Sequence, residues 1–344
     1  MPEWSVAEPR KLTFDEPVSE LQVRIVNGTV NVVGTDEGSA RLEVGELEGP
    51  PLVVTLRDGT LTVAYEDLPW KGFLKWLDRK GWRRSAEVSL AVPAHTHVEV
   101  GVVSAAAVVS GIEGRAEVRG VSGDTTLVGL AGPVRADTVS GSVEAQALGG
   151  DLRFHSVSGD LTVVEGAGSS VRADSVSGSM IVDLDPTGGP SDVGLTSVSG
   201  EIAIRLPHPA DAEVEANTAS GAVSNAFEDL RVTGQWGAKR ITGRLGAGNG
   251  RLKATTVSGS IALLRRPPAE DDGPRPGPAD GPRNTSGDHA HSGPGGRGHH
   301  ADQRPGRWHD RQEGALTCPP SSLTAASAST CSSCSTRPRD TVTR

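Results

Sequence analysis

VSGD at residues 157–160 decides the fold, because close copies of this tetrad recur along the chain. VSGD also stands at 121–124, VSGS at 139–142, 176–179 and 257–260, VSGE at 198–201, and ASGA at 219–222. The tetrad glycines are separated by 18, 18, 19, 22, 21 and 38 residues. A period near 20 residues is typical of solenoids. The last interval is close to two steps, which predicts a copy that has lost its signature.

Residues on either side of each tetrad alternate between apolar and polar, as β-strands do. Examples are Val134–Thr138 before one tetrad and Leu161–Val163 after another. The spacers hold no run of about ten residues with helical periodicity, which a βαβ crossover would need. We therefore expect an all-β, β-helix-like solenoid whose coils of 18–22 residues stack roughly 4.8 Å apart.

Each tetrad residue has a predicted role at a coil corner. The valine is expected to point inward and the glycine to turn the chain at positive φ. The serines form either a ligand or ion strip or a repeated corner that bonds nearby backbone, and we favour the corner. The predicted corner glycines are Gly123, Gly141, Gly159, Gly178, Gly200, Gly221 and Gly259.

Composition restricts the function. The formal net charge of −9 argues against nucleic-acid binding, which needs a basic face. Residues 1–17 lack the apolar run of a signal peptide and no stretch of 18 apolar residues occurs, so we expect a cytoplasmic protein. All three cysteines lie in the last 27 residues, which predicts a folded body without disulfides.

Two composition changes suggest the domain organisation. We predict a solenoid domain at 12–265, in which the irregular, glycine-rich residues 231–250 hold the missing copy. Residues 267–344 are rich in Pro, Gly, Ser and charge, and we expect a disordered low-complexity tail. An alternative for the tail is an off-frame reading of a G+C-rich gene.

Residues 67–85 interrupt the repeats with an amphipathic insertion. Its apolar residues follow helical spacing and its basic residues are numerous. It is either a cap on the solenoid or an anchor at an anionic membrane surface. The candidate binding residues are Trp70, Lys71, Phe73, Lys75, Trp76, Arg79, Lys80, Trp82, Arg83 and Arg84.

Candidate catalytic and metal residues are scattered. Asp137, Asp174 and Asp183 are predicted on one face, but only because the repeat recurs. His95 and His97 make at most half a metal site, and His155 beside Ser156 lacks any sign of an acid that would orient it as a base. We therefore predict no catalytic residues, no metal site and no cofactor.

The array resembles the bacterial putative-adhesin family of β-solenoid proteins, especially its actinobacterial members. The resemblance rests on the VSG runs, on residues 26–30, on Val92-Pro93-Ala94 and on residues 256–261. It implies a β-helix-like fold without known catalytic residues, and some relatives are linked to envelope stress.

These observations predict a non-enzymatic binding or structural solenoid, associated with the cell envelope at the inner membrane face. Its expected partners are a protein or an anionic membrane surface, and its coil ends could pair into a homo-oligomer because they are sheet edges. Two alternatives remain open: a carbohydrate-active β-helix enzyme, and a secreted adhesin whose export signal is missing.

Overall fold

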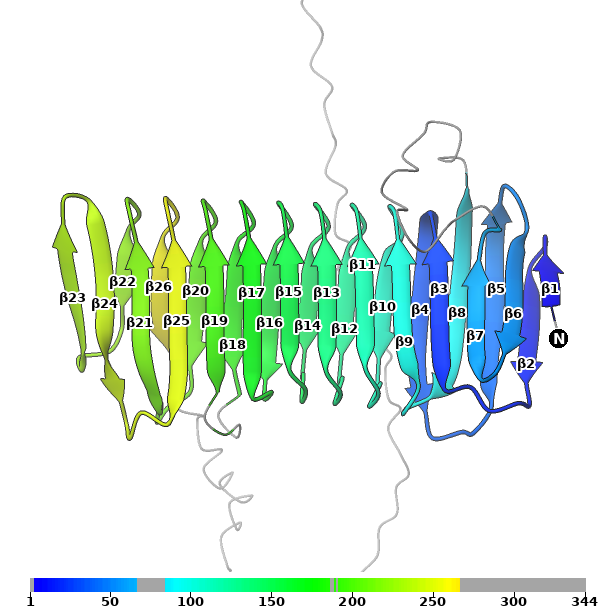
Figure 1. Ribbon diagram of the computed structural model, residues 1–344, viewed down its shortest axis with the longest axis horizontal. Helices are drawn as coiled ribbons and strands as arrows, with labels where there is room; N and C mark the ends of the chain where they lie inside the picture. Colours follow the sequence, from blue (N-terminus) through cyan, green and yellow to red (C-terminus); the bar gives the residue numbers. More distant parts are fainter. Residues whose placement is uncertain (1–2, 67–83, 186–188, 190, 267–344) are drawn as a thin grey trace, which may run out of the picture. The chain divides into compact units, whose positions relative to one another are not determined.

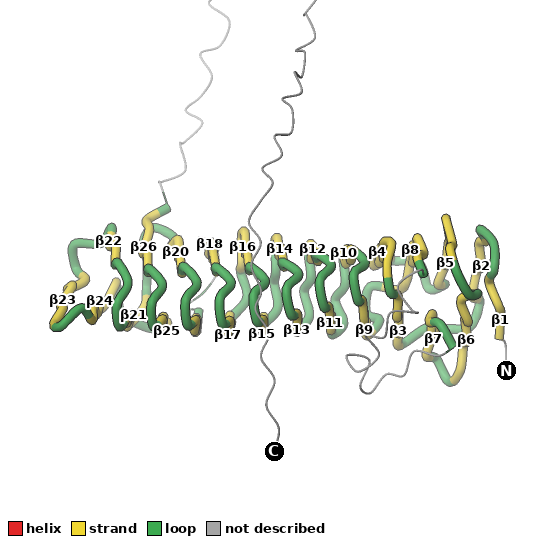
Figure 2. The backbone as a smooth tube through the Cα atoms, turned by 90° about the horizontal axis from the view of Figure 1, so that it is seen from above, coloured by secondary structure: helices red, strands yellow, loops and turns green. Residues whose placement is uncertain are grey.

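A computed structural model describes residues 3–66, 84–185, 189 and 191–266. All the regular elements among them are β-strands, arranged in a 14-stranded sheet A and a 12-stranded sheet B. Seen along the strands, the sheets form two facing rows (Figure 2). Successive strands of the central coils alternate between the two sheets, so the predicted all-β solenoid is confirmed. The predicted tail, 267–344, and most of the insertion lie outside the described residues.

Six coils in the middle of the body follow one plan (Figure 1). Each coil places a strand in sheet A, turns at a corner, and places a strand in sheet B, with parallel pairing to the next coil such as Val134↔Leu152. Sheet A receives β9 (His97–Val102), β11 (Ala116–Gly120), β13 (Val134–Thr138), β15 (Leu152–Ser156), β17 (Ser170–Ser175) and β19 (Asp192–Ser197). Sheet B receives β10 (Ala106–Ser110), β12 (Thr125–Val128), β14 (Val143–Gln146), β16 (Leu161–Gly166), β18 (Met180–Leu184) and β20 (Ile202–Leu206).

The core lies between the two sheets and consists of alternate strand residues. Val134, Ala136 and Leu152 point inward from sheet A, while Val143 and Leu161 point inward from sheet B. Small β-branched residues and alanine dominate because the two sheets of each coil are close together. The low aromatic content of 3% is consistent with this narrow core.

The C-terminal end corrects the prediction of a missing copy. Its strands are β21 (Ala212–Thr218), β22 (Val223–Asn225), β23 (Leu230–Gln235), β24 (Ala238–Leu245), β25 (Gly250–Thr256) and β26 (Ile261–Arg265). Strand β25 pairs with β19 on one side and β21 on the other, and β26 likewise lies between β20 and β22. The last coil is therefore inserted between two earlier ones. Strands β23 and β24 form an antiparallel hairpin at the edge of sheet A, not a coil.

The N-terminal end is also out of chain order. Strands β3 (Glu20–Ile25) and β4 (Asn27–Thr35) pair with the first regular coil, and β7 (Thr60–Ala64) and β8 (Ser85–Pro93) pair with their other sides. Farther out lie β5 (Ala40–Glu48), β6 (Leu52–Arg57), β1 (Glu3–Val6) and β2 (Arg10–Phe14). They join through antiparallel pairs, and the rings of Trp4 and Phe14 meet edge to face at 5.3 Å.

The tetrad glycines serve close approach between coils and do not provide positive φ. Described glycines with positive φ occur elsewhere, as at Gly111 and Gly129. A Cβ on Gly159 would overlap the carbonyl oxygen of Gly141 in the neighbouring coil, and a Cβ on Gly178 would overlap that of Gly159. The predicted reason for the glycine was thus wrong, because the constraint is steric. A second ladder with the same constraint, Gly132, Gly150 and Gly168, stands at the opposite edge.

The tetrad valines point outward, so their predicted inward packing was also wrong. Val157, Val176, Val198 and Val257 are 51%, 49%, 47% and 52% exposed. Their carbonyl oxygens instead accept a bond from the serine of the adjacent coil, as Ser158 N–H donates to Val139 at 2.8 Å. Inward packing belongs to the strand residues, which leaves the corner valine on the rim. We call this rim, from Val103 to Val257, the valine edge.

Hydroxyl groups complete each corner. Ser158 Oγ donates to the Val139 carbonyl at 3.2 Å, and the hydroxyl before the tetrad accepts from the glycine, as Ser156 Oγ does from Gly159 N–H at 2.7 Å. The tetrad serines thus make hydrogen bonds to the backbone, as predicted if they serve as a repeated corner. Sequence reading missed one corner, Val103-Ser104-Ala105, because alanine stands in place of glycine. Its serine still lies 2.9 Å from the hydroxyl of Ser122.

Candidate docking surface

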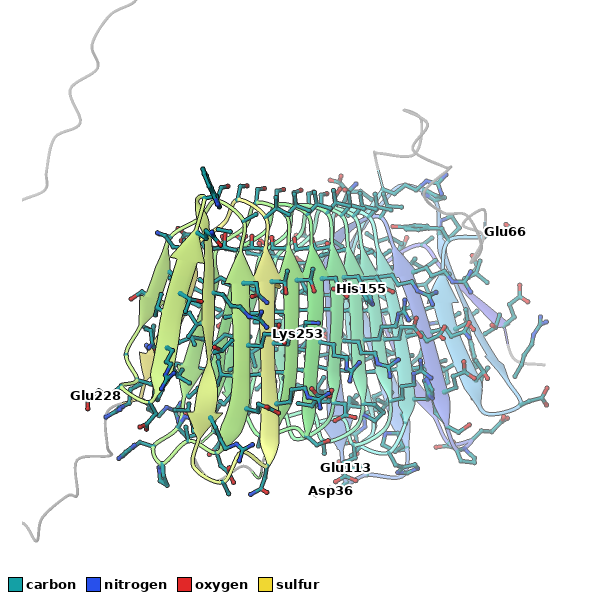
Figure 3. All side chains as sticks on the ribbon, turned by 60° about the vertical axis from the view of Figure 1, so that its left-hand side comes forward. Asp36, Glu66, Glu113, His155, Glu228 and Lys253 are labelled. Atoms are coloured by element: carbon teal, nitrogen blue, oxygen red, sulfur yellow. The ribbon has the colours of Figure 1, made fainter. Side chains whose placement is uncertain are left out.

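The outward face of sheet A is charged and largely neutralised by its own ion pairs. Arg135 contacts Asp137 at 2.8 Å, and Arg172 contacts Asp192 at 2.8 Å. Figure 3 shows His155 and Lys253 pointing away from the same face. The first pair lies within β13 and the second joins adjacent coils, so opposite charges on this face neutralise each other both along and across the strands.

Glu99 and Glu117 stand directly opposite each other on β9 and β11. Burial and the nearby carboxylate of Glu117 raise the pKa of Glu99. Glu117 is itself buried and bonds to Arg119. A raised carboxylate pKa in a groove would favour the carbohydrate-active enzyme. However, the grooves described below are lined by other residues. We therefore assign Glu99 and Glu117 to the charged outward face of sheet A.

Three aspartates predicted to share one face do not. Asp137 and Asp174 lie on sheet A, whereas Asp183 belongs to β18 of sheet B. Asp183 is buried and its Oδ2 accepts from Arg205 at 3.2 Å and Arg266 at 2.8 Å. The sequence held the signal for this, because Asp137 and Asp174 precede a tetrad and Asp183 follows one, and the strands before and after a tetrad belong to different sheets.

His155 does have an acidic neighbour. Its Nδ1 lies 3.4 Å from Asp174 in the adjacent coil, a contact that only the stacking of coils creates. Ser156 does not complete a catalytic arrangement, because its Oγ is used by Gly159 N–H. His95 precedes β9 in a turn while His97 begins the strand, and Thr96 between them is buried. Among the described residues, no three metal-ligating side chains come together.

The outward face of sheet B contrasts with that of sheet A. Residue pairing places Val108, Thr126, Glu144, Thr162, Ile181, Ala203 and Ala262 in one row. A second row holds Val33, Ser110, Val128, Gln146 and Val164. Val33, Val108 and Ile181 of these rows are 37%, 39% and 51% exposed, and Leu264 of β26 is 38% exposed. We call the two rows the sheet B face.

One end of the sheet B face is hollowed into a groove of about 400 Å³. Asn31 and Val33 of β4 lie in it together with Ser89 and Ala91 of β8. At its rim Lys11 pairs with Glu43 at 2.9 Å. The face therefore combines an apolar surface with a polar border, the usual composition of a protein interface.

The insertion predicted to bind a partner lies mostly outside the described residues. Of its candidate residues, Arg84 is described, and its guanidinium carbon lies 5.4 Å from the centre of the Tyr65 ring. Tyr65 is buried, which raises the pKa of its hydroxyl to about 12. The backbone oxygen of Arg84 accepts from Asn27 at 3.2 Å. Arg84 thus packs at the base of the insertion, and the binding role of the other nine residues stays a prediction.

A sequence profile of the Toastrack DUF4097 family matches residues 18–264. The chain belongs to the Toastrack DUF4097 family. This range includes every tetrad and both rows of the sheet B face. The predicted resemblance to a family of repeat-containing β-solenoids is thereby confirmed at the family level, while an actinobacterial type stays a prediction. No curated protein matches the chain.

Several solved structures are similar to this chain at low identity. A "putative adhesin" from Bacteroides fragilis is 11% identical, with a TM-score of 0.37 over 75% of this chain and 98% of that one. A "putative lipid binding protein" from Parabacteroides distasonis is 12% identical, with a TM-score of 0.34 over 76% and 98%. A "putative cell adhesion protein" from Clostridium sporogenes is 13% identical, with a TM-score of 0.26 over 75% and 100%. The part of this chain that the structure describes contains no helix able to cross a membrane.

Proposed function

We propose that this Toastrack protein is a non-enzymatic docking module that presents the sheet B face to a protein partner. The observation that supports it is the difference between the two outward faces. Sheet A pairs charges within a strand and across coils, whereas sheet B exposes apolar and hydroxyl side chains over successive coils, among them Val108 and Ile181.

A protein fits this surface better than a polyanion does. Arg205 lies on β20 toward the C-terminal end of sheet B, outside the two rows, and it is bonded to buried Asp183. Phosphate groups need several free basic residues, which these rows do not supply. Exposed valine, isoleucine and leucine with threonine and glutamine between them can instead pack against apolar side chains and bond at the margins.

Rigidity supports the same proposal. The glycine ladders at both edges bring the backbones of adjacent coils into contact, and corner hydroxyls fill the remaining bonding positions. A surface that is fixed before binding loses less conformational entropy when a partner docks. A stack of coils with one exposed row per strand is therefore a suitable docking platform.

Association with the cell envelope is part of the proposal but rests on sequence. The candidate anchor, residues 70–83, lies outside the described part of the chain, and a cytoplasmic location at the inner membrane face stays a prediction. The secreted adhesin remains the alternative, because the sheet B face could serve on either side of a membrane.

Site-specific photo-crosslinking in cells tests the proposal. A benzoylphenylalanine is placed at Ile181 on the sheet B face, and a matched one at exposed Arg153 on sheet A. We expect a discrete crosslinked product from position 181, absent from position 153, and suppressed by Val108→Lys or Ala203→Lys. Equal crosslinking from both positions, or none from position 181, would contradict the proposal. A product of twice the chain's mass would identify a second copy as the partner.

A further inference from the structure

The hairpin of β23 and β24 extends sheet A beyond the last coil (Figure 1). Sheet B ends at β22, so the hairpin has no sheet B strand opposite it. Ile241 and Leu245 are buried, while Val232 is 51% exposed. The hairpin thus packs on the body through β24 and through Leu230 at the start of β23, while the rest of β23 is exposed.

Trp236 at the tip of this hairpin is the most exposed large apolar residue described, at 95%. It also has a φ of 54°, followed by Gly237 at 89°. Left-handed backbone is costly for a bulky residue, and asparagine or glycine is the ordinary choice at this position of a two-residue hairpin turn. A strained backbone conformation and a fully exposed indole at the same residue are typical of a functional position.

The charge around Trp236 is one-sided. Lys239 and Arg240 follow the turn closely, while Arg231 and Arg244 lie toward the opposite end of the hairpin, which carries no acidic residue. Arg240 pairs with Glu215 on β21 at 2.8 Å. The two corners nearest to the hairpin end in the neutral residues Ala222 and Ser260, and the earlier corners end in either an acid or a serine. The basic side chains beside the tryptophan are therefore Lys239 and the ion-paired Arg240.

A groove of about 730 Å³ lies beside the tryptophan. It is lined by Trp236 and Lys239 from the hairpin and by Ala219 and Val257 from the two nearest corners. Val257 is the last half-exposed valine of the valine edge. The hairpin tip and the valine edge therefore form one continuous amphipathic rim with its basic residues at the hairpin end.

We propose that this rim docks on an anionic lipid surface, with Trp236 inserted at the headgroup level and Lys239 close to lipid phosphates. Indole rings with one apolar and one polar side favour this level of a bilayer, and nearby basic residues are attracted to anionic lipid. An indole that is 95% exposed at a turn can enter a deformable surface, which needs no preformed pocket. The inference goes beyond the proposed function, since it uses a different surface from the sheet B face.

Vesicle flotation with the full chain tests the inference. Vesicles of phosphatidylcholine alone are compared with vesicles that contain phosphatidylserine, at low and high salt. Trp236→Asn removes the indole and relieves the strained φ, so it should melt no lower than the wild type. We expect binding to anionic vesicles to weaken on the order of tenfold in Trp236→Asn, and about fivefold in Lys239→Gln at low salt. Lys253→Gln, an exposed lysine on the sheet A face, is the matched control and should bind normally.

Three results would overturn the inference: no binding by the wild type, equal binding to neutral and anionic vesicles, or full binding by Trp236→Asn. A Trp70→Ala/Trp76→Ala variant separates this site from the insertion. If that variant alone loses binding, the membrane anchor is the insertion and the rim is not one. The in-cell crosslinking experiment with the probe at position 181 can also be run in the Trp236→Asn variant. If that variant loses the crosslinked product without any change in vesicle binding, the occupant is a protein and the lipid inference is rejected.

Discussion

The guanidinium Nη2 of Arg266 donates a hydrogen bond of 2.8 Å to the carboxylate Oδ2 of Asp183, 83 residues earlier in the chain. Asp183 is buried and receives a second bond from Arg205 at 3.2 Å. The backbone N–H of Arg266 also donates to Leu206 at 2.9 Å. The end of β26 is therefore fastened to two earlier coils, which secures the coil that the chain inserts last.

Arg266→Gln should lower the free energy of unfolding by about 1–3 kcal/mol, because a buried carboxylate loses one of its two charged donors. Hydrogen exchange should rise first in β26. Urea denaturation measures the first effect and exchange mass spectrometry the second. Lys253→Gln is the control, and a double-mutant cycle with Asp183→Asn should show coupling. If the effects of Arg266→Gln and Asp183→Asn on the free energy of unfolding were additive, the two residues would not stabilise each other and the prediction would be contradicted.

Gly159→Ala should destabilise the solenoid by about 1–3 kcal/mol, because its Cβ would overlap the Gly141 carbonyl oxygen. Gly194→Ala is the matched control within strand β19, since a Cβ there meets open space. That control should be neutral or slightly stabilising, because alanine restricts the unfolded chain. Thermal melts of the two variants give the comparison. Equal melting temperatures would show that the ladder tolerates a side chain.

Val157→Ala should cost less than about 0.5 kcal/mol, because this corner valine is half exposed. Val143→Ala removes two methyl groups from a valine that is 3% exposed and should cost about 1.6 kcal/mol or more. Urea denaturation distinguishes the two. A large loss from Val157→Ala would mean that the valine edge packs in the core after all.

Glu99→Gln should stabilise the protein at pH 7 by about 0.2–1 kcal/mol, because it removes a like-charge pair with Glu117. The pKa of Glu99 is raised above its ordinary value of 4.5. Its proton therefore stabilises the folded state fully below pH 4.5, and that stability is lost as the pH rises through the folded pKa. The gain from the substitution should accordingly disappear near pH 4. Melts across this pH range test the sign, with Glu144→Gln on sheet B as the control.

Asp211→Ala should loosen residues 246–249, which lead into β25. Asp211 accepts bonds from the backbone and side chain of Asn249 and from Gly248, and these bonds hold its pKa below the ordinary value of 3.8. The stabilisation is present above pH 3.8 and is lost as the pH falls through the folded pKa. Limited proteolysis at neutral pH should therefore cut the variant faster than the wild type. Hydrogen exchange of residues 246–249 in Asp211→Ala and in the wild type should become similar at acidic pH. The control variant Asp229→Ala should match the wild type at every pH.

Local patterns predicted the strands and the repeat, because an alternating segment with a glycine corner has few other ways to bury its apolar side. Strands such as Leu152–Ser156 and Leu161–Gly166 follow directly from that alternation. The same patterns predicted the backbone role of Ser158, since a hydroxyl at a corner bonds locally. The outward side of Val157 follows from continuing the alternation of Leu152 and Phe154 through the inward hydroxyl residue before the tetrad, but an apolar valine was wrongly expected to point inward.

By itself, the sequence determined that this chain is an all-β solenoid with coils of about 18–22 residues, since that is a matter of local periodicity. Tertiary structure alone decided which surfaces face outward together. It placed β25–β26 between earlier coils, put Asp174 beside His155, and separated a charged sheet A from an apolar sheet B face. The physical reason is that these relationships join residues of different coils. The order of the coils depends on which strands pair at the open edges of the two sheets, and the sequence of a single repeat does not determine that pairing.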